Sequence, residues 1–200
     1  MPAPRDLTDA PVEPADAAIT VRGERFRRYL DADTIDARIQ ELGRTISTAY
    51  ADTTPILVSV LNGAFMFTAD LMRAIPIDCE VDFIKLSSYG DEKVSSGQVH
   101  ELKSVDANLE GRDVLIVEDI VDTGLSMQFM MNRLTEYNPA TLRCVTLLHK
   151  PVATEPDLDL DYVGFQIPDL FVIGYGLDYG QIARNLSDIY ILDEEQNGRA

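Results

Sequence analysis

The chain has 200 residues, of which 46% are hydrophobic, and it carries a formal net charge of −17. Its length suits one domain with a sizeable core, and its charge argues against nucleic acid as a partner, because affinity for nucleic acid comes largely from lysine and arginine on phosphates. No apolar run approaches the roughly 20 residues that span a bilayer, and residues 1–18 lack the apolar centre of a secretory signal, so we expect a cytoplasmic protein without a membrane partner.

The N-terminal quarter of the chain predicts a tail and then a helix. Four prolines among acids and alanines favour a disordered or loosely docked tail over residues 1–20. Residues 21–30 hold four arginines and fit either a short strand or a surface segment. From Asp33 to Ala51 apolar residues recur at the helical period, which predicts a helix with Asp33 as its N-cap.

Strands and helices then alternate along the chain. This alternation predicts an α/β fold with a central, mostly parallel sheet flanked by helices. Mainly apolar runs predict buried strands at 55–61, 114–117 and 141–148. Further strands are expected at 79–86, 99–102, 162–167 and 187–192, and helices at 64–74 and 125–137. Cys79 and Cys144 lie in or beside these strands without metal-like spacing, so we expect buried free thiols in a reducing compartment.

The stretch from Val114 to Ser126 (VLIVEDIVDTGLS) carries the strongest chemical signal. Glu118 and Asp119 follow its apolar run, where the strand is expected to end, and the residues from Asp122 onward can form a tight turn before a helix. Backbone N–H groups and a helix N-terminus around one small volume suit a phosphate. The acidic pair would repel a phosphate alone but suits sugar hydroxyls or Mg²⁺, which prefers oxygen ligands. A sugar phosphate carried with a metal is therefore the predicted ligand.

This stretch resembles the ribose-phosphate signature of the type I phosphoribosyltransferases, which is an apolar strand, two acidic residues and then D-T-G-x-S/T. The resemblance covers about residues 33–192. It implies the fold of that family as a single domain over residues 21–193, with a small hood formed by terminal segments, mainly residues 162–192, a flexible lid at about 87–111 and a tail at 194–200. It also implies that the ribose 5-phosphate is bound by Glu118, Asp119, Asp122, Thr123, Gly124, Leu125 and Ser126.

Two more stretches resemble the hypoxanthine-guanine branch of this family. Residues 168–186 are similar to its purine-binding hood over nearly their full length, and the pair Ser88 and Tyr89 resembles its catalytic lid. The resemblance implies that the purine is bound by Phe171, whose ring can stack on a flat base, by the carbonyl of Val172, by Lys150 and by Asp178.

The loop after the first buried strand receives pyrophosphate in the resembled family, often through a non-proline cis peptide. Leu61, Asn62 and Gly63 occupy it here, and Asn62 stands where the family usually has a basic residue. We therefore expect contact through backbone amides or the Asn62 amide. Arg184 falls on a further pyrophosphate contact of the family, and the metal contacts implied for Mg²⁺ are Glu118, Asp119 and Asp178.

The activity that the resemblance implies is a purine-salvage reaction. The 5-phosphoribosyl group of 5-phosphoribosyl 1-pyrophosphate passes to a 6-oxopurine, hypoxanthine and also guanine, which gives IMP or GMP and pyrophosphate. Asp122, as an unpaired carboxylate, is the expected catalytic base for the imidazole proton of the purine. Lys150 is expected to donate to the 6-oxo group and so to select oxopurines over adenine. An assembly of two or four copies is also expected.

Three alternatives stay open. The same fold can serve another acceptor base, such as xanthine, adenine or orotate. A regulator that keeps the sugar-phosphate site but binds RNA needs a basic face, of which a chain with a net charge of −17 gives little sign. A pure interaction protein on this scaffold would release no pyrophosphate.

Overall fold

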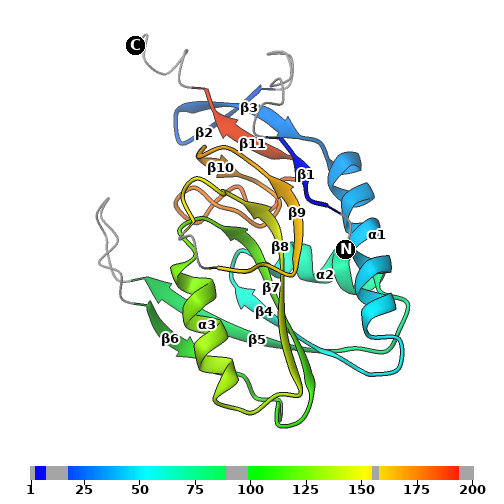
Figure 1. Ribbon diagram of the computed structural model, residues 1–200. Helices are drawn as coiled ribbons and strands as arrows, with labels where there is room; N and C mark the ends of the chain where they lie inside the picture. Colours follow the sequence, from blue (N-terminus) through cyan, green and yellow to red (C-terminus); the bar gives the residue numbers. More distant parts are fainter. Residues whose placement is uncertain (1–2, 8–17, 89–98, 155–157, 194–200) are drawn as a thin grey trace.

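The computed structural model describes residues 3–7, 18–88, 99–154 and 158–193, and they form two β-sheets with three helices (Figure 1). The larger sheet has seven strands, and all of its pairings are parallel except the one at the β6 edge. This confirms the predicted central sheet. In spatial order its strands are β1 (Arg5–Asp6), β9 (Tyr162–Gln166), β8 (Thr141–His149), β7 (Asp113–Val121), β4 (Ile56–Leu61), β5 (Glu80–Ser88) and β6 (Val99–Lys103).

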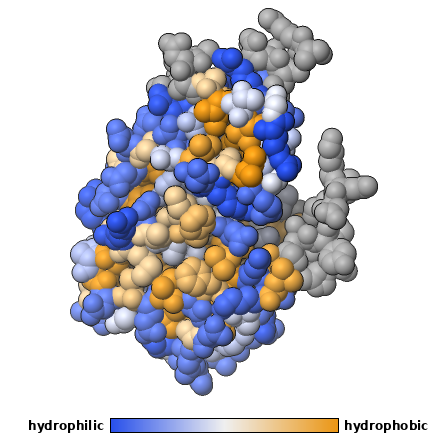
Figure 2. Space-filling model, turned by 180° about the vertical axis from the view of Figure 1, so that it is seen from behind, coloured by the Kyte–Doolittle hydropathy of each residue, from blue (hydrophilic) through white to orange (hydrophobic). Residues whose placement is uncertain are grey.

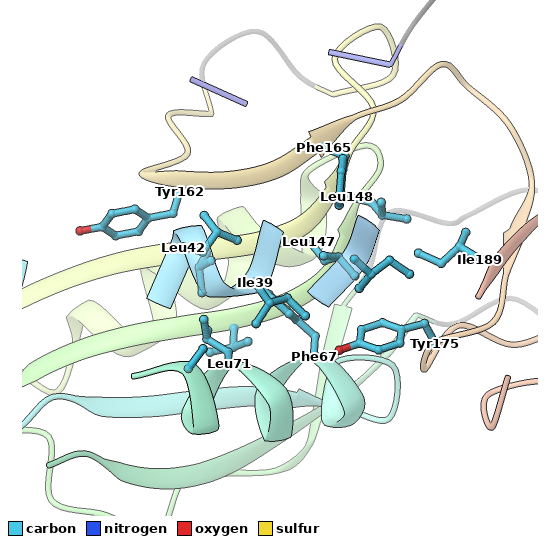
Figure 3. Packing of buried hydrophobic residues seen from close by; sticks show 14 of the residues in the cluster. Ile39, Leu42, Phe67, Leu71, Leu147, Leu148, Tyr162, Phe165, Tyr175 and Ile189 are labelled. Carbon is cyan, nitrogen blue, oxygen red and sulfur yellow. The ribbon is translucent and has the colours of Figure 1, made fainter. Parts of the chain in front are cut away.

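The central strands are buried on both faces because helices cover both faces of the sheet. Helices α1 (Ala32–Ala49) and α2 (Phe65–Ala74) pack on one face, where Ile39 and Phe67 lie close together (Figure 3) and share a core cluster with alternate strand residues such as Leu115. Helix α3 (Leu125–Thr135) packs on the other face against the intervening residues, such as Ile116. Successive side chains of a strand point to opposite faces of the sheet, so one apolar run contributes residues to the cores on both faces. Within the described part of the chain, none of the helices combines the length and apolarity that crossing a bilayer requires.

The N-cap of helix α1 lies two residues before the predicted one. The N-cap is Asp31, whose carboxylate accepts a hydrogen bond from the backbone N–H of Thr34 at 2.7 Å. Asp33, which was predicted to cap the helix, lies in its first turn, where a negative charge favours the helix dipole. Both aspartates suit a helix start, and the sequence alone did not separate them.

A smaller antiparallel sheet forms the hood. Its order is β10 (Val172–Ile173), β11 (Ile189–Leu192), β3 (Glu24–Leu30) and β2 (Ala18–Val21). Of residues 162–192, which were expected to supply most of the hood, β10 and β11 lie in this sheet and β9 pairs with β8 in the larger one, while β2 and β3 supply the other two hood strands. Tyr175 ties the hood to the main core, since its ring joins the α1–α2 cluster and its hydroxyl donates to Asp70 at 2.6 Å (Figure 3).

Part of the predicted N-terminal tail is ordered. Strand β1 extends the edge of the larger sheet beside β9, and β2 pairs along its length with the arginine-rich strand β3. Hydrogen bonding to existing strand edges outweighs the prolines here, because the prolines lie outside both strands. The remainder of the predicted tails, residues 1–2, 8–17 and 194–200, lies outside the described residues.

The surface is mainly hydrophilic, as the composition requires. On the face opposite that of Figure 1, hydrophobic residues gather in a band across the middle, with hydrophilic residues around it (Figure 2). Cys144 is buried and Cys79 is partly buried, and both are free thiols as predicted. Burial raises the pKa of the Cys144 thiol to about 12, which keeps it protonated and unreactive.

Candidate active site

Two cavities lie where the parallel strands end beneath the hood, which is the usual ligand position of open α/β sheets. The larger, of about 360 Å³, brings together residues from the acidic pair, the predicted pyrophosphate loop and the hood. The smaller, of about 90 Å³, is lined by Glu118 and the turn after β7. Predicted site residues that line one or both are Leu61, Gly63, Glu118, Asp119, Asp122, Thr123, Gly124, Ser126, Val172, Asp178 and Arg184.

The turn from Asp122 to Gly124 connects β7 to α3 as predicted. Gly124 has a φ of 85°, in the left-handed region that glycine adopts without strain, and α3 begins at the next residue, Leu125. Gly124, as the N-cap, offers no side-chain oxygen, and the N–H of Leu125 makes only a long hydrogen bond, of 3.5 Å, to the hydroxyl of Thr123. The first N–H groups of a helix have no partner within the helix, so those at the start of α3 can donate to a ligand oxygen beside the turn that lines the smaller cavity. This is the geometry of an anion site at a helix N-terminus.

Glu118 and Asp119 lie inside β7 and not at its end, which corrects the prediction. The β-branched residues Ile120 and Val121 continue the pairing with β8, so the strand runs past the acidic pair. Both carboxylates are buried, at 7% and 8% exposure. Burial, and then the charge of Asp119, raises the pKa of Glu118 well above its usual range, and burial also raises the pKa of Asp119. Two adjacent buried carboxylates of this kind favour a cation or hydroxyl donors beside them.

The proposed metal contacts do not form a three-residue cluster. Asp178 instead binds Arg184 at 2.6 Å, and in the described part of the chain no three His, Cys, Asp or Glu side chains are grouped to hold a metal. The acidic pair nevertheless fits Mg²⁺, because this ion takes one or two carboxylates from a protein and its other oxygens from phosphate and water.

The loop between β4 and α2 has the cis peptide that the resemblance implied, between Leu61 and Asn62. The next residue, Gly63, is packed so closely that a Cβ there would lie 1.7 Å from a carboxylate oxygen of Asp119. On the hood side, a Cβ on Gly176 would lie 2.1 Å from the carbonyl oxygen of Gly63. Two glycines thus let the loop touch both the acidic pair and the hood. Asn62 itself is exposed.

The carboxylate of Asp122 is paired, which corrects the prediction that it is unpaired. The ammonium of Lys150 donates to Asp122 at 2.8 Å and to Asp169 at 3.0 Å. Burial alone would lower the pKa of Lys150, but hydrogen bonds and charge from the two aspartates raise it overall, so the ammonium stays charged. The sequence analysis did not identify Asp169, although this residue follows β9, which ends at the same edge of the sheet as β7 and β8.

The ring of Phe171 stands at the hood, 47% exposed. Phe26 lies behind it with ring centroids 6.3 Å apart, and Tyr179 meets it edge-on at 5.6 Å. The guanidinium of Arg22 lies over the Tyr179 ring at 5.6 Å. Arg22 and Phe26 come from the arginine-rich segment, for which the sequence predicts no single structure, and Tyr179 lies within residues 168–186 but was not singled out there.

The predicted lid is described only in part. Ser88 ends β5, and β6 pairs back on β5 in the antiparallel sense, which confirms the short strand expected within the lid. Tyr89 lies outside the described residues. Four other predicted residues line neither cavity, namely Asn62, Leu125, Lys150 and Phe171. Lys150 is hydrogen-bonded to Asp122, which lines the smaller cavity, and Phe171 precedes Val172, which lines the larger one.

The fold and the site together define a sugar-phosphate-binding α/β protein, with a parallel sheet, an acidic pair and an amide-lined turn beneath an aromatic hood. Residues 27–180 match the phosphoribosyl transferase domain, and the chain belongs to this family.

Three comparisons show the closeness of this relationship. The chain is 45% identical over 188 residues to a hypoxanthine-guanine phosphoribosyltransferase of Mycobacterium avium, a match that covers 91% of this chain and 93% of the relative. It is 42% identical over 163 residues to a protein of that name from Bacillus subtilis (strain 168), across 82% and 91% of the two chains. A crystal structure of a hypoxanthine phosphoribosyltransferase from Staphylococcus aureus superposes with a TM-score of 0.80 at 36% identity, covering 85% of this chain and 92% of that one.

Proposed function

We propose that this chain transfers the 5-phosphoribosyl group from 5-phosphoribosyl 1-pyrophosphate to hypoxanthine and guanine, releasing pyrophosphate and forming IMP or GMP in purine salvage. The observation that carries the proposal is the meeting of three parts at one sheet edge: the turn after β7, the acidic pair, and the hood. The names of the relatives support the same reaction.

The phosphoribosyl end is assigned to residues 118–126. The N–H groups of the turn and of the α3 N-terminus hold the 5-phosphate, where Thr123 and Ser126 add hydroxyl donors. Glu118 and Asp119 accept from the ribose hydroxyls. When bound beside them, Mg²⁺ supplies positive charge to the pyrophosphate oxygens.

The leaving pyrophosphate is assigned to the loop at Leu61, Asn62 and Gly63, together with Arg184. Arg184 donates to the carbonyl of Gly176 at 2.7 Å and pairs with Asp178, so its guanidinium is already held at the cavity wall. Negative charge grows on pyrophosphate as its bond to the sugar breaks, and a placed guanidinium stabilises that charge. The Asn62 amide takes the place of a cation in this loop.

The purine is assigned to the other side of the cavity. Phe171 stacks on the base, the carbonyl of Val172 reads its edge, and Lys150 donates to the 6-oxo group. Asp122 removes the imidazole proton as the purine nitrogen attacks the sugar carbon, the step for which a base within hydrogen-bonding reach is required. The lid role of Ser88 and Tyr89 stays a prediction.

One assay tests the proposal. Pyrophosphate release is measured with Mg²⁺ and phosphoribosyl pyrophosphate while hypoxanthine, guanine, xanthine, adenine and orotate are offered in turn. Release with hypoxanthine and guanine, and little with the other bases, is expected because Lys150 donates to an oxo group where adenine presents an amino group. If none of the five bases supports pyrophosphate release, the chain is not the proposed enzyme. If only adenine or only orotate supports release, that base is the acceptor.

The compartment and the assembly also remain proposals. Two free thiols suit the reducing cytoplasm. An assembly of two or four copies would cover part of the apolar band on the face shown in Figure 2. Light scattering of the purified protein gives the number of copies directly.

A further inference from the structure

A single buried ammonium is shared by two carboxylates in the proposed purine site. The side chain of Lys150 is 8% exposed, while the side chains of its partners Asp122 and Asp169 are 49% and 65% exposed. The proposed function uses Lys150 and Asp122 and gives Asp169 no role. We propose that Asp169 is a positioning residue, which holds the Lys150 ammonium toward the purine while Asp122 acts as the base; this inference rests on the proposed function.

The backbone fixes the relative positions of the three residues. Asp122, Lys150 and Asp169 follow the adjacent strands β7, β8 and β9. The N–H of Lys150 donates to the carbonyl of Val121 at 2.9 Å, and the N–H of Ile167 donates to the carbonyl of His149 at 2.8 Å. Each post-strand segment is thus bonded to its neighbour just before the charged side chain. The contact between the three side chains is a product of the sheet and not of chance proximity at the surface.

The number of donors gives Asp169 a directional effect. An ammonium group has three N–H donors and no acceptor. Two of them point to Asp122 and Asp169, so the direction of the third is set by both partners. With one partner removed, the flexible lysine side chain can rotate about the remaining bond, and donation to an oxo group at a fixed place becomes less frequent.

Charge balance gives it a second effect during the reaction. When Asp122 accepts the purine proton, it becomes neutral and no longer balances the lysine charge. A buried charge that loses its partner is strongly destabilised. Asp169 remains bonded to Lys150 at that moment, and water reaches its carboxylate because the side chain is mostly exposed. The ammonium therefore stays paired before and after proton transfer.

The position of Asp169 also links this lysine to the stacking ring. Asp169 lies two residues before Phe171, on the short segment between β9 and β10. A bond from Lys150 to this segment joins the group assigned to the purine edge and the ring assigned to the purine face. The ammonium and the ring then keep a fixed position relative to each other, which favours a single orientation of the bound base.

The test compares Asp169→Asn, Asp169→Ala and Asp169→Glu with the wild type and with Asp52→Asn, which changes an exposed aspartate in the turn after α1. Loss of one charge-assisted hydrogen bond to Lys150 is expected to raise KM for hypoxanthine about tenfold and to lower kcat by a similar factor. The KM for phosphoribosyl pyrophosphate is expected to stay within about twofold, because its proposed contacts are elsewhere. Asp169→Glu restores much of the loss, and Asp52→Asn matches the wild type.

A double-mutant cycle shows whether the effect passes through Lys150. If it does, Asp169→Asn has little further effect on KM for hypoxanthine in a Lys150→Ala background. Equal effects in both backgrounds, an unchanged KM for hypoxanthine, or equal rises in both KM values would overturn the inference. Thermal unfolding identifies a variant that is poorly folded, in which case the isosteric Asp169→Asn decides. A wild-type protein inactive with every base would instead refute the proposed function itself.

Discussion

The part of the site assigned to the phosphoribosyl group and the part assigned to the purine are built in different ways. Residues 118–126 form the first side from one continuous strand, turn and helix start, and the donors proposed for the phosphate there are largely backbone N–H groups. The purine side is assembled from side chains on separate segments, with Lys150 after β8, Asp169 after β9, and Phe26 and Phe171 in the hood. A backbone site depends on local conformation, whereas a side-chain site depends on how distant segments pack. Substitutions should therefore act through geometry on the first side and through lost contacts on the second.

Asp122 belongs to both sides, and its substitution should have the largest effect. It lies in the turn proposed to hold the phosphate, where it lines the smaller cavity, and its carboxylate accepts a hydrogen bond from Lys150. Asp122→Asn keeps the shape but removes the base, so kcat should fall by about 10²- to 10⁴-fold, the usual scale for acid–base groups. Steady-state kinetics with hypoxanthine measure this. Near-wild-type turnover would take Asp122 out of the mechanism.

Gly63→Ala tests the claim that the sugar-phosphate side works through backbone geometry. The new Cβ would meet the carboxylate of Asp119, which must move. A displacement of about 1 Å can cost about 10²-fold in rate, so we expect kcat/KM for phosphoribosyl pyrophosphate to fall by about that factor.

The matched control for this variant is Gly43→Ala, whose Cβ would lie 2.5 Å from the carbonyl oxygen of Ala74 between α1 and α2. Overpacking there should lower stability by about 1–3 kcal/mol and leave the KM for phosphoribosyl pyrophosphate unchanged. The same kinetic loss in both variants would show that Gly63→Ala acts by general destabilisation.

Phe171→Ala tests the purine side, where a smaller loss is expected. Stacking on an aromatic ring contributes about 0.5–1.5 kcal/mol beyond burial, so KM for hypoxanthine should rise up to about tenfold while KM for phosphoribosyl pyrophosphate stays constant. Ile182→Ala removes another exposed apolar side chain, 48% exposed, and should change neither constant. A rise in both constants for Phe171→Ala would indicate that the whole hood has shifted.

Asp31→Ala lies outside both regions and should affect stability alone. Hydrogen bonding to Thr34, first of all from its backbone N–H, lowers the pKa of Asp31 in the folded protein. A carboxylate with a lowered pKa stabilises the fold above its unfolded pKa, and the contribution is lost as the pH falls through the folded value. Substitution should therefore cost about 1 kcal/mol at pH 7 and progressively less below about pH 4. Urea unfolding at pH 7 and below about pH 4 measures the loss of stability at each pH. An equal loss at both would show that packing, and not the carboxylate charge, is responsible.

The contrast between the two sides also explains how far the sequence could predict the molecule. The strand, turn and helix start around Gly124 were predicted because each depends on residues within one short stretch. The pairing of Asp122 with Lys150, and the contact of Phe26 with Phe171, join residues from different segments, and no local pattern encodes them. Strand β3 belongs with this second group, since its arginines conceal the alternation that a strand with one buried face normally shows.

The meeting of Gly63 and Gly176 has a consequence for redesigning base preference. At this contact, which we call the joint, the backbone of Gly63 packs directly against the backbone of Gly176. No side chain lies between them whose size could be changed to alter the distance between the loop and the hood. Repositioning the hood to admit a differently shaped acceptor would press on, or pull away from, the floor assigned to the departing diphosphate. Altered base choice and altered leaving-group binding should consequently emerge together, unless the new preference is built from side chains such as Phe171 and Asp169 that stand clear of the joint.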